Sequence, residues 1–136
     1  QSMISGHAGS LSTVHANTAR DALIRMETLS LMSDIDIPVY VARAQVASAI
    51  DLVVQITRFS EDGSRKVTRV SEAFGLDDQN RYQLQDLYAS RMQGKKEDGM
   101  LDVSLERTGN KPTFATEPLE AGMQTRITHT ASLWGE

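Results

Sequence analysis

Apolar residues recur with helical spacing in two stretches of the first fifty positions. Thr18 and Asp21 match a capping box, in which the side chain at a helix start accepts a hydrogen bond from the amide three residues later. The positions behind them predict a helix over about 19–32, with an apolar face formed by Ala22, Leu23, Met26 and Leu29. Pro38 suits the first turn of a second helix, whose apolar face would consist of Val39, Ala42, Val46, Ala49 and Ile50.

Strand patterns follow the second helix. Residues 52–59 are apolar and β-branched, which predicts a buried strand, and residues 66–74 alternate as a second strand does. The turn sequence EDGS between them predicts a hairpin. Residues 82–92 and 100–106 predict two more strands, joined through the turn sequence GKKEDG.

Three further segments carry weaker patterns. Leu11, Thr13 and Val14 form a short β-leaning run ahead of the first helix. After an interruption at 108–112, residues 114–123 predict a short helix that ends at Gly122. The last dozen residues show no clear pattern.

The predicted order is therefore a strand, two helices and then several strands joined by hairpins. This order suits the closing half of an α/β domain with an antiparallel extension on its sheet. The opening QSMISGHAGSLSTVHA has no start methionine and runs at once into a dense motif, so we expect a chain cut in mid-domain. The edges of such a sheet need cover from the missing half or from a neighbour.

Composition restricts the function classes. The chain has 136 residues, of which 40% are hydrophobic and 24% charged, as in an ordinary globular domain. Its 14 basic and 18 acidic residues give a net charge of −4, which provides no overall attraction to nucleic acid or anionic lipid. The absence of cysteine excludes disulfides and thiolate chemistry. The most apolar run, AQVASAIDLVVQI, is too short to span a bilayer.

One dense motif carries candidate chemistry. The segment GHAGSLSTVHAN combines two histidines with several hydroxyl side chains. It resembles the His box of the traffic ATPases, which drive type II and type IV secretion, conjugation and pilus assembly. The continuation RDALIRME and the segments ARAQVASAIDLVVQITRF and DGSRKVTRVSE are also similar to that family. With YQLQDLY and TGNKPTF, the chain most resembles the tight-adherence (Flp) pilus-assembly branch, over nearly all of residues 3–123.

The resemblance implies an α/β fold, namely the C-terminal half of a RecA-like P-loop NTPase domain with antiparallel strand additions. Residues 1–75 would be the distal part of the ATPase core with the His box. Residues 76–123 would be a strand-rich extension with a short helix, and residues 124–136 a flexible tail.

The implied parent protein is a cytoplasmic ATPase at the inner-membrane face. It would form a homohexameric ring, use ATP and Mg²⁺, and act on an inner-membrane platform protein of a pilus or secretion machine. The phosphate-binding motif G-x-x-x-x-G-K-[ST] does not occur in the 136 residues. Since phosphate binding depends on that loop, we expect this chain alone neither to bind nor to hydrolyse ATP.

By the same resemblance, His7 and His15 lie on the γ-phosphate side of the nucleotide site and sense the terminal phosphate. Ser10, Ser12 and Thr13 would orient the two rings. Without the resemblance, such a histidine pair is more often structural. A zinc site is disfavoured, because a third and a fourth ligand are missing.

Alternatives remain open at this point. Arg43 is either a solvated arginine on the second helix or a contact between subunits. The chain as a whole is alternatively a non-catalytic interaction or regulatory module of a secretion machine, or part of a conjugative-transfer ATPase. Its net charge of −4 gives no support to direct DNA binding.

Overall fold

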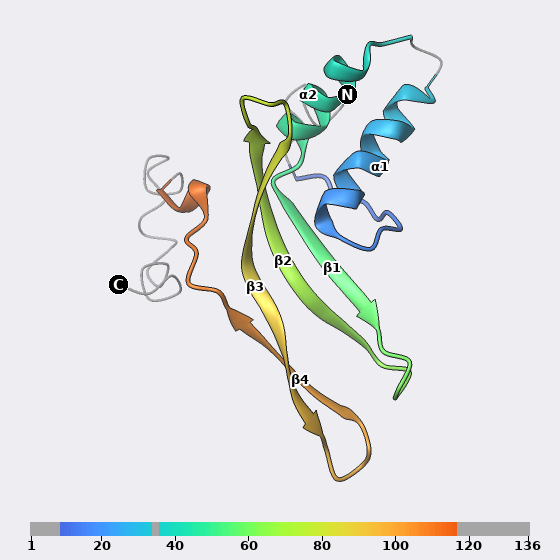
Figure 1. Cartoon of the computed structure of the whole chain (residues 1–136), viewed down its shortest axis with the longest axis vertical. Coiled ribbons are helices and arrows are strands. Elements are labelled where there is room, and N and C mark those ends of the chain that lie inside the picture. Colours follow the sequence, from blue (N-terminus) through green and yellow to red (C-terminus); the bar gives the residue numbers. More distant parts are fainter. Residues whose placement is uncertain (1–8, 34–35, 117–136) are drawn as a thin grey trace.

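Two helices precede a four-stranded sheet in the computed structural model, which describes residues 9–33 and 36–116 (Figure 1). The four strands pair in the order β1-β2-β3-β4, and every pair is antiparallel. The elements are α1 (Ala19–Leu31), α2 (Val39–Ala49), β1 (Leu52–Arg58), β2 (Arg65–Leu76), β3 (Tyr82–Lys95), β4 (Leu101–Arg107) and the 3-10 turn η1 (Thr113–Thr116).

Helix α1 begins where the capping pattern predicts. The Thr18 Oγ1 accepts a hydrogen bond from the Asp21 amide at 3.1 Å, which satisfies one of the free N–H groups of the first turn. Behind this cap, Ala19, Ala22 and Leu23 are buried. The predicted helix over about 19–32 is thereby confirmed.

Replacing Thr18 by alanine removes this cap. We expect Thr18→Ala to lower the free energy of unfolding of the 136-residue chain by about 1 kcal/mol. Urea unfolding followed by circular dichroism measures the change. Thr18→Ser, which keeps an acceptor oxygen, serves as the control, and an equal loss in both variants would show that the hydroxyl does not cap α1.

Helix α2 is also confirmed, and Pro38 precedes it as the N-cap residue. The Pro38 carbonyl accepts the amides of Val41 and Ala42, so the proline starts the helix without needing an N–H of its own. Of the predicted apolar face, Ala42 and Val46 are buried, whereas Val39 in the first turn is exposed.

The predicted hairpins are confirmed. The turn between β1 and β2 places Gly63 at φ 71°, a left-handed conformation that glycine adopts without strain. Gly94 has φ 136° and lies where the register of β3 and β4 shifts, which is typical of a bulge. The described strands therefore form an up-and-down meander.

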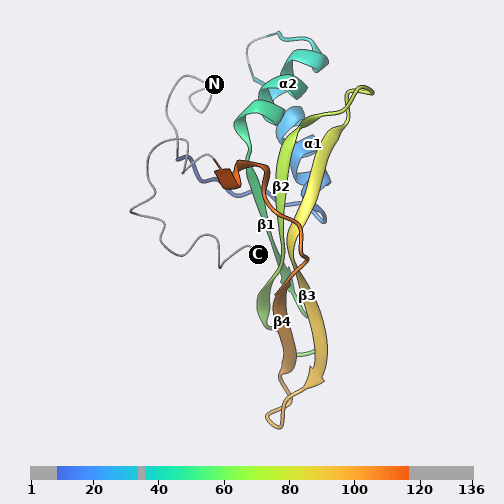
Figure 2. The ribbon, with the colours of Figure 1, turned by 90° about the vertical axis from the view of Figure 1, so that its left-hand side faces the viewer.

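The two faces of the sheet have different covers. Val53 on β1 and Ala73 on β2 pack with Leu23 of α1 and Val46 of α2, so the helices cover this face. Successive residues of a strand point to opposite faces, so Glu72 points away from the helices. There it contacts Thr113 of η1. In Figure 2, β1 and β2 lie between η1 and α1.

Two sequence-based predictions need correction. The strand over 52–59 is not buried, because it is an edge strand and, among the described residues, the helices cover only one of its faces. Its outer face leaves Leu52 45%, Val54 53% and Ile56 59% exposed.

The run Leu11–Val14 is not a strand, since no described strand lies beside it to accept its hydrogen bonds, and Leu11 is 98% exposed. Of the helix predicted over 114–123, the structure describes a 3-10 turn at Thr113–Thr116. The remaining residues of that prediction, and the tail 124–136, lie outside the described residues.

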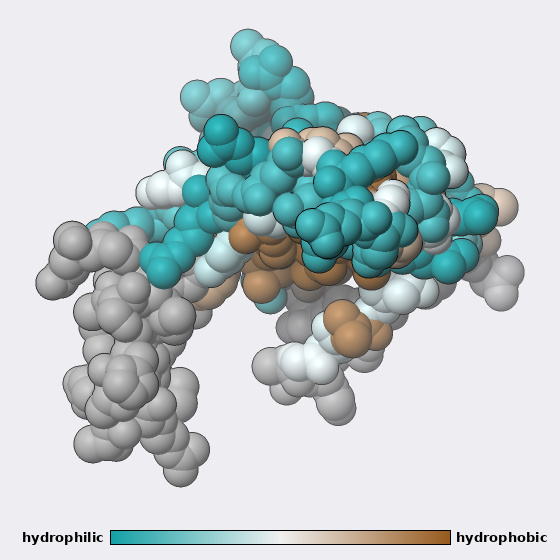
Figure 3. Space-filling model, turned by 90° about the horizontal axis from the view of Figure 1, so that it is seen from below, coloured by the Kyte–Doolittle hydropathy of each residue, from teal (hydrophilic) through white to brown (hydrophobic). Residues whose placement is uncertain are grey.

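The helices gather at one end of the sheet, and the β3–β4 hairpin extends to the other end (Figure 1). Seen along the long axis, hydrophobic surface gathers along one side of the molecule (Figure 3). The fold class is therefore mixed α/β, with two helices on a four-stranded antiparallel sheet. Within the described residues no helix is long and apolar enough to cross a membrane.

Candidate functional site

The histidine-bearing segment is an irregular stretch that leads directly into α1. Residues 9–16 have no regular secondary structure, and His15 is exposed three positions before the Thr18 cap. The segment is attached to the sheet where the Gln55 amide donates to the Ala16 carbonyl at 3.2 Å. His7, the other predicted histidine, lies outside the described residues.

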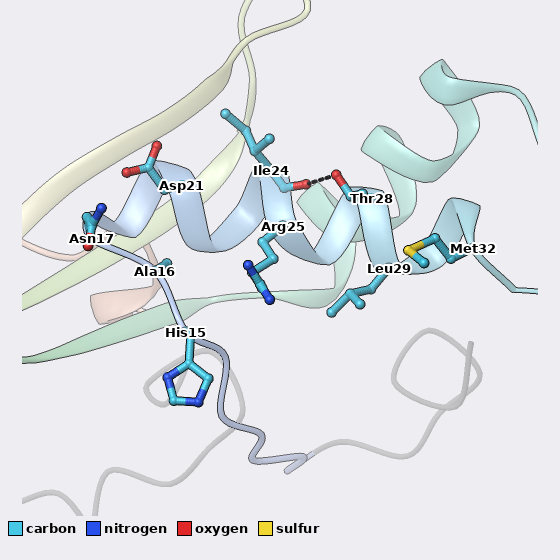
Figure 4. A pocket seen from close by; sticks show the side chains of 9 residues that line it. All are labelled: His15, Ala16, Asn17, Asp21, Ile24, Arg25, Thr28, Leu29 and Met32. Atoms are coloured by element: carbon cyan, nitrogen blue, oxygen red, sulfur yellow. Dashed lines mark hydrogen bonds between the residues drawn. The ribbon is translucent and has the colours of Figure 1, made fainter.

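A shallow hollow of about 490 Å³ separates this segment from the outer side of α1 (Figure 4). His15 and Asn17 border it from the segment, and Asp21, Arg25 and Thr28 border it from the helix. In Figure 4 the Arg25 guanidinium lies on the same side of α1 as His15, whereas the Asp21 carboxylate points away. Thr28 does not face the hollow as a free donor, because its hydroxyl donates to the Ile24 carbonyl at 3.0 Å.

None of the predicted hydroxyl residues borders the hollow beside His15. Ser10, Ser12 and Thr13 are exposed, and Ser12 and Thr13 border a second hollow of about 260 Å³ together with Met26, Leu29 and Ser30. Within the part of the chain that the structure describes, none of these three hydroxyls is hydrogen-bonded to His15. Their orienting role stays a prediction.

Arg43 is engaged inside the chain. Its guanidinium donates to both carboxylate oxygens of Glu27, Nε to Oε2 and Nη2 to Oε1, each at 2.9 Å. A third donor reaches the Asn80 carbonyl at 3.2 Å, in the turn before β3. Arg43 is therefore not a free surface arginine, and its predicted contact with another subunit stays a prediction.

Tyr82 completes a three-residue cluster that joins α1, α2 and β3. Its hydroxyl donates to Glu27 Oε2 at 3.0 Å. The hydrogen bonds from Arg43, and after them the one from Tyr82, lower the pKa of Glu27 although burial opposes the shift. Burial first, and then the contact with Glu27, raises the pKa of Tyr82. Glu27 is thus an ionised carboxylate on α1 that joins this helix to α2 and β3.

Sequence reasoning missed this cluster. The available signal was Glu27 itself, which follows Leu23 by four positions and so falls on the buried face of α1. A carboxylate on a buried helix face needs a cationic partner. Arg43 on the next helix was the candidate.

A second buried carboxylate, Glu72, attaches the segment after β4 to the outer face of the sheet. Glu72 is 1% exposed. It accepts hydrogen bonds from the Thr113 amide at 2.8 Å, from the Thr113 hydroxyl and from the Gln85 amide group at 2.6 Å. Gln85 also donates to the Lys111 carbonyl, so β3 and the segment before η1 are connected at the same point.

Asp62 connects the β1–β2 turn to the start of β4. Its carboxylate accepts the amides of Ser64 at 2.9 Å and Leu101 at 2.8 Å. Hydrogen bonding from Ser64 first, and then from the Leu101 amide, lowers the pKa of Asp62 from 3.8 to about 2.

This shift predicts the acid stability. Because the pKa of Asp62 is lower in the folded chain, its ionised form stabilises the fold above about pH 4, and this contribution is lost as the pH falls toward 2. Glu27, whose pKa is also lowered, adds a loss of the same sign. We expect the urea concentration at the unfolding midpoint to decrease as the pH falls from about 4 to 2. The decrease should be smaller in Asp62→Asn than in wild type. Equal acid dependence in both proteins would exclude a role for Asp62.

The donor set does not form a metal site among the described residues. No three histidine or carboxylate groups in 9–33 and 36–116 gather closely enough to hold an ion. The hollow beside His15 likewise has no loop of successive backbone amides of the kind that holds a triphosphate. Its lining combines the polar side chains of His15, Asn17 and Arg25 with the apolar residues Ile24, Leu29 and Met32.

The described residues thus combine a mixed α/β fold with an exposed histidine that precedes a capped helix. Residues 1–103 match the family model described as Type II/IV secretion system protein. The chain belongs to this family, the type II/IV secretion system ATPases. No curated protein matched the sequence. The matched residues include the histidine segment, both helices and all strands up to the first part of β4.

Proposed function

We propose that this chain is the C-terminal part of an ATPase of the tight-adherence (Flp) pilus-assembly branch. The parent protein, as a cytoplasmic homohexamer peripheral to the inner membrane, couples ATP hydrolysis to a membrane platform protein. The single observation that best supports a nucleotide-facing role is the exposure of His15 on an irregular segment, three positions before the cap of α1.

In this proposal His15, together with His7, responds to the γ-phosphate of ATP. The imidazole donates a hydrogen bond to a terminal phosphate oxygen, and this bond is lost when the phosphate leaves. Since His15 is close in sequence to Thr18, a shift of the segment moves the first turn of α1. Glu27 then passes the shift to α2 and β3 through Arg43 and Tyr82.

ATP and Mg²⁺ bind mainly through other parts of the parent. The 136 residues contain no G-x-x-x-x-G-K-[ST] loop, so the chain supplies one side of the site. Residues 1–75 belong to the ATPase core, and residues 76–123 form an extension that is available to partner proteins.

An ATP hydrolysis assay of the parent beside the isolated chain tests the proposal. We expect steady turnover by the parent and none by the 136-residue chain at equal molar concentration. A parent without the phosphate-binding loop and without turnover would favour the non-catalytic module instead. Turnover that depends on added DNA would favour the conjugative-transfer ATPase.

A further inference from the structure

Arg25 is the second donor on the hollow beside His15, and the proposed function does not use it. It is exposed on the outer side of α1, one turn beyond Asp21. Asp21 and Arg25 have the spacing at which a helix forms an ion pair. Among the described residues, however, Arg25 makes no salt bridge, and Figure 4 shows the Asp21 carboxylate on the other side of the helix.

The guanidinium instead lies over the space that His15 borders (Figure 4). The planar N–H groups of a guanidinium can donate to two oxygens of one phosphate. The imidazole of His15 would add one further donor from another direction. Asn17 also borders the hollow, but in Figure 4 its side chain lies near Asp21 at the start of α1. His15 and Arg25 come from the two walls of the hollow, so an anion held by both would contact the segment and the helix at once.

We propose that Arg25 binds the terminal phosphate of the nucleotide together with His15, and so joins the histidine segment to α1 when ATP is bound. This inference rests on the proposed function and adds a binding residue to it. The bound anion bridges two walls that the described contacts leave separate. Loss of the terminal phosphate removes the bridge, and the segment is then held through the Ala16 carbonyl and Gln55.

Nucleotide binding by the parent protein tests the proposal. The dissociation constants for ATPγS and ADP are measured for wild type, Arg25→Gln, Arg25→Lys and Arg20→Gln. We expect Arg25→Gln to weaken ATPγS binding at least about tenfold, as loss of a charged hydrogen-bonding partner does, and to leave ADP binding unchanged. Arg25→Lys keeps the charge but lacks the planar guanidinium group. Its dissociation constant for ATPγS should therefore lie between those of wild type and Arg25→Gln.

Arg20→Gln is the matched control, because Arg20 is an exposed arginine of the same helix that does not border the hollow. It should bind both nucleotides as wild type does. Since Arg25 is exposed and makes no salt bridge with a described residue, its replacement should not change the unfolding midpoint. The two proposals fail differently: a parent that binds no ATPγS overturns both. Normal ATPγS binding by Arg25→Gln, while His15→Ala is weakened, overturns the role of Arg25 alone.

Discussion

Replacing Glu27 by alanine is expected to lower the free energy of unfolding of the chain by about 3 kcal/mol, the lower end of the range for breaking a buried ion pair. Glu27 is 6% exposed and is the acceptor for Arg43 and Tyr82 alike. Its removal leaves the Tyr82 hydroxyl, in a residue that is 5% exposed, without its carboxylate. The lower end of the range applies because the Arg43 side chain is 31% exposed and regains water.

Urea unfolding of the 136-residue chain measures this loss, and the chain offers a matched control. Glu106→Ala breaks the ion pair between Arg91 and Glu106, in which Nη1 and Oε2 are 3.8 Å apart. The side chains of Arg91 and Glu106 are 74% and 43% exposed. We expect that variant to lose less than about 1 kcal/mol. Similar losses in the two variants would show that the Glu27 cluster does not hold the helices on the sheet. Tyr82→Phe, which removes one hydrogen bond, should cost about 1 kcal/mol.

Replacing His15 by alanine in the parent protein is expected to reduce ATP turnover about a hundredfold. Removal of a single hydrogen-bond donor to a transition-state oxygen has effects of this order. His15 is exposed, so the substitution should leave both the fold and the ring intact. Steady-state kinetics at saturating ATP measures the turnover, and light scattering measures the oligomeric state.

His129→Ala provides the control for His15, since it changes the third histidine of the chain, outside the predicted motif. It should turn over ATP at the wild-type rate. Unchanged turnover in His15→Ala would refute a role in the reaction. Loss of the hexameric ring in His15→Ala would instead indicate that His15 is a structural histidine. Without the family resemblance, this is the alternative that the sequence favours.

The local elements could be predicted from the sequence because their signals are local. The Thr18 cap and the apolar spacing behind it locate α1, and Pro38 locates the start of α2. The turn at Gly63 locates the first hairpin, because it needs a residue in the left-handed backbone conformation. In these places a few neighbouring residues decide the backbone conformation.

The exposure of β1 could not be predicted in the same way. Its apolar, β-branched residues suit a strand covered on both faces, and the pattern does not say that one face lacks a cover among the described residues. The same holds for Leu11–Val14, whose β-leaning residues form no strand without a neighbouring strand. Both depend on what lies beside the segment in space.

The candidate site was predicted in part. The motif indicated His15, and the structure describes it as exposed beside a hollow, but the three hydroxyl residues are not bonded to it. The Glu27–Arg43–Tyr82 cluster was missed, since Glu27 and Tyr82 are 55 residues apart and no local pattern joins them. The position of Arg25 beside the hollow was also not predicted, because a single arginine on a helix is usually solvated.

The ratio of the affinities of the parent protein for ATPγS and ADP, measured with and without His15→Ala, tests most directly whether this segment senses the terminal phosphate. If His15 donates to that phosphate, the substitution lowers the ratio at least about tenfold by weakening ATPγS binding, and it leaves ADP binding unchanged. An unchanged ratio, or an equal loss of affinity for both nucleotides, would contradict the sensing role.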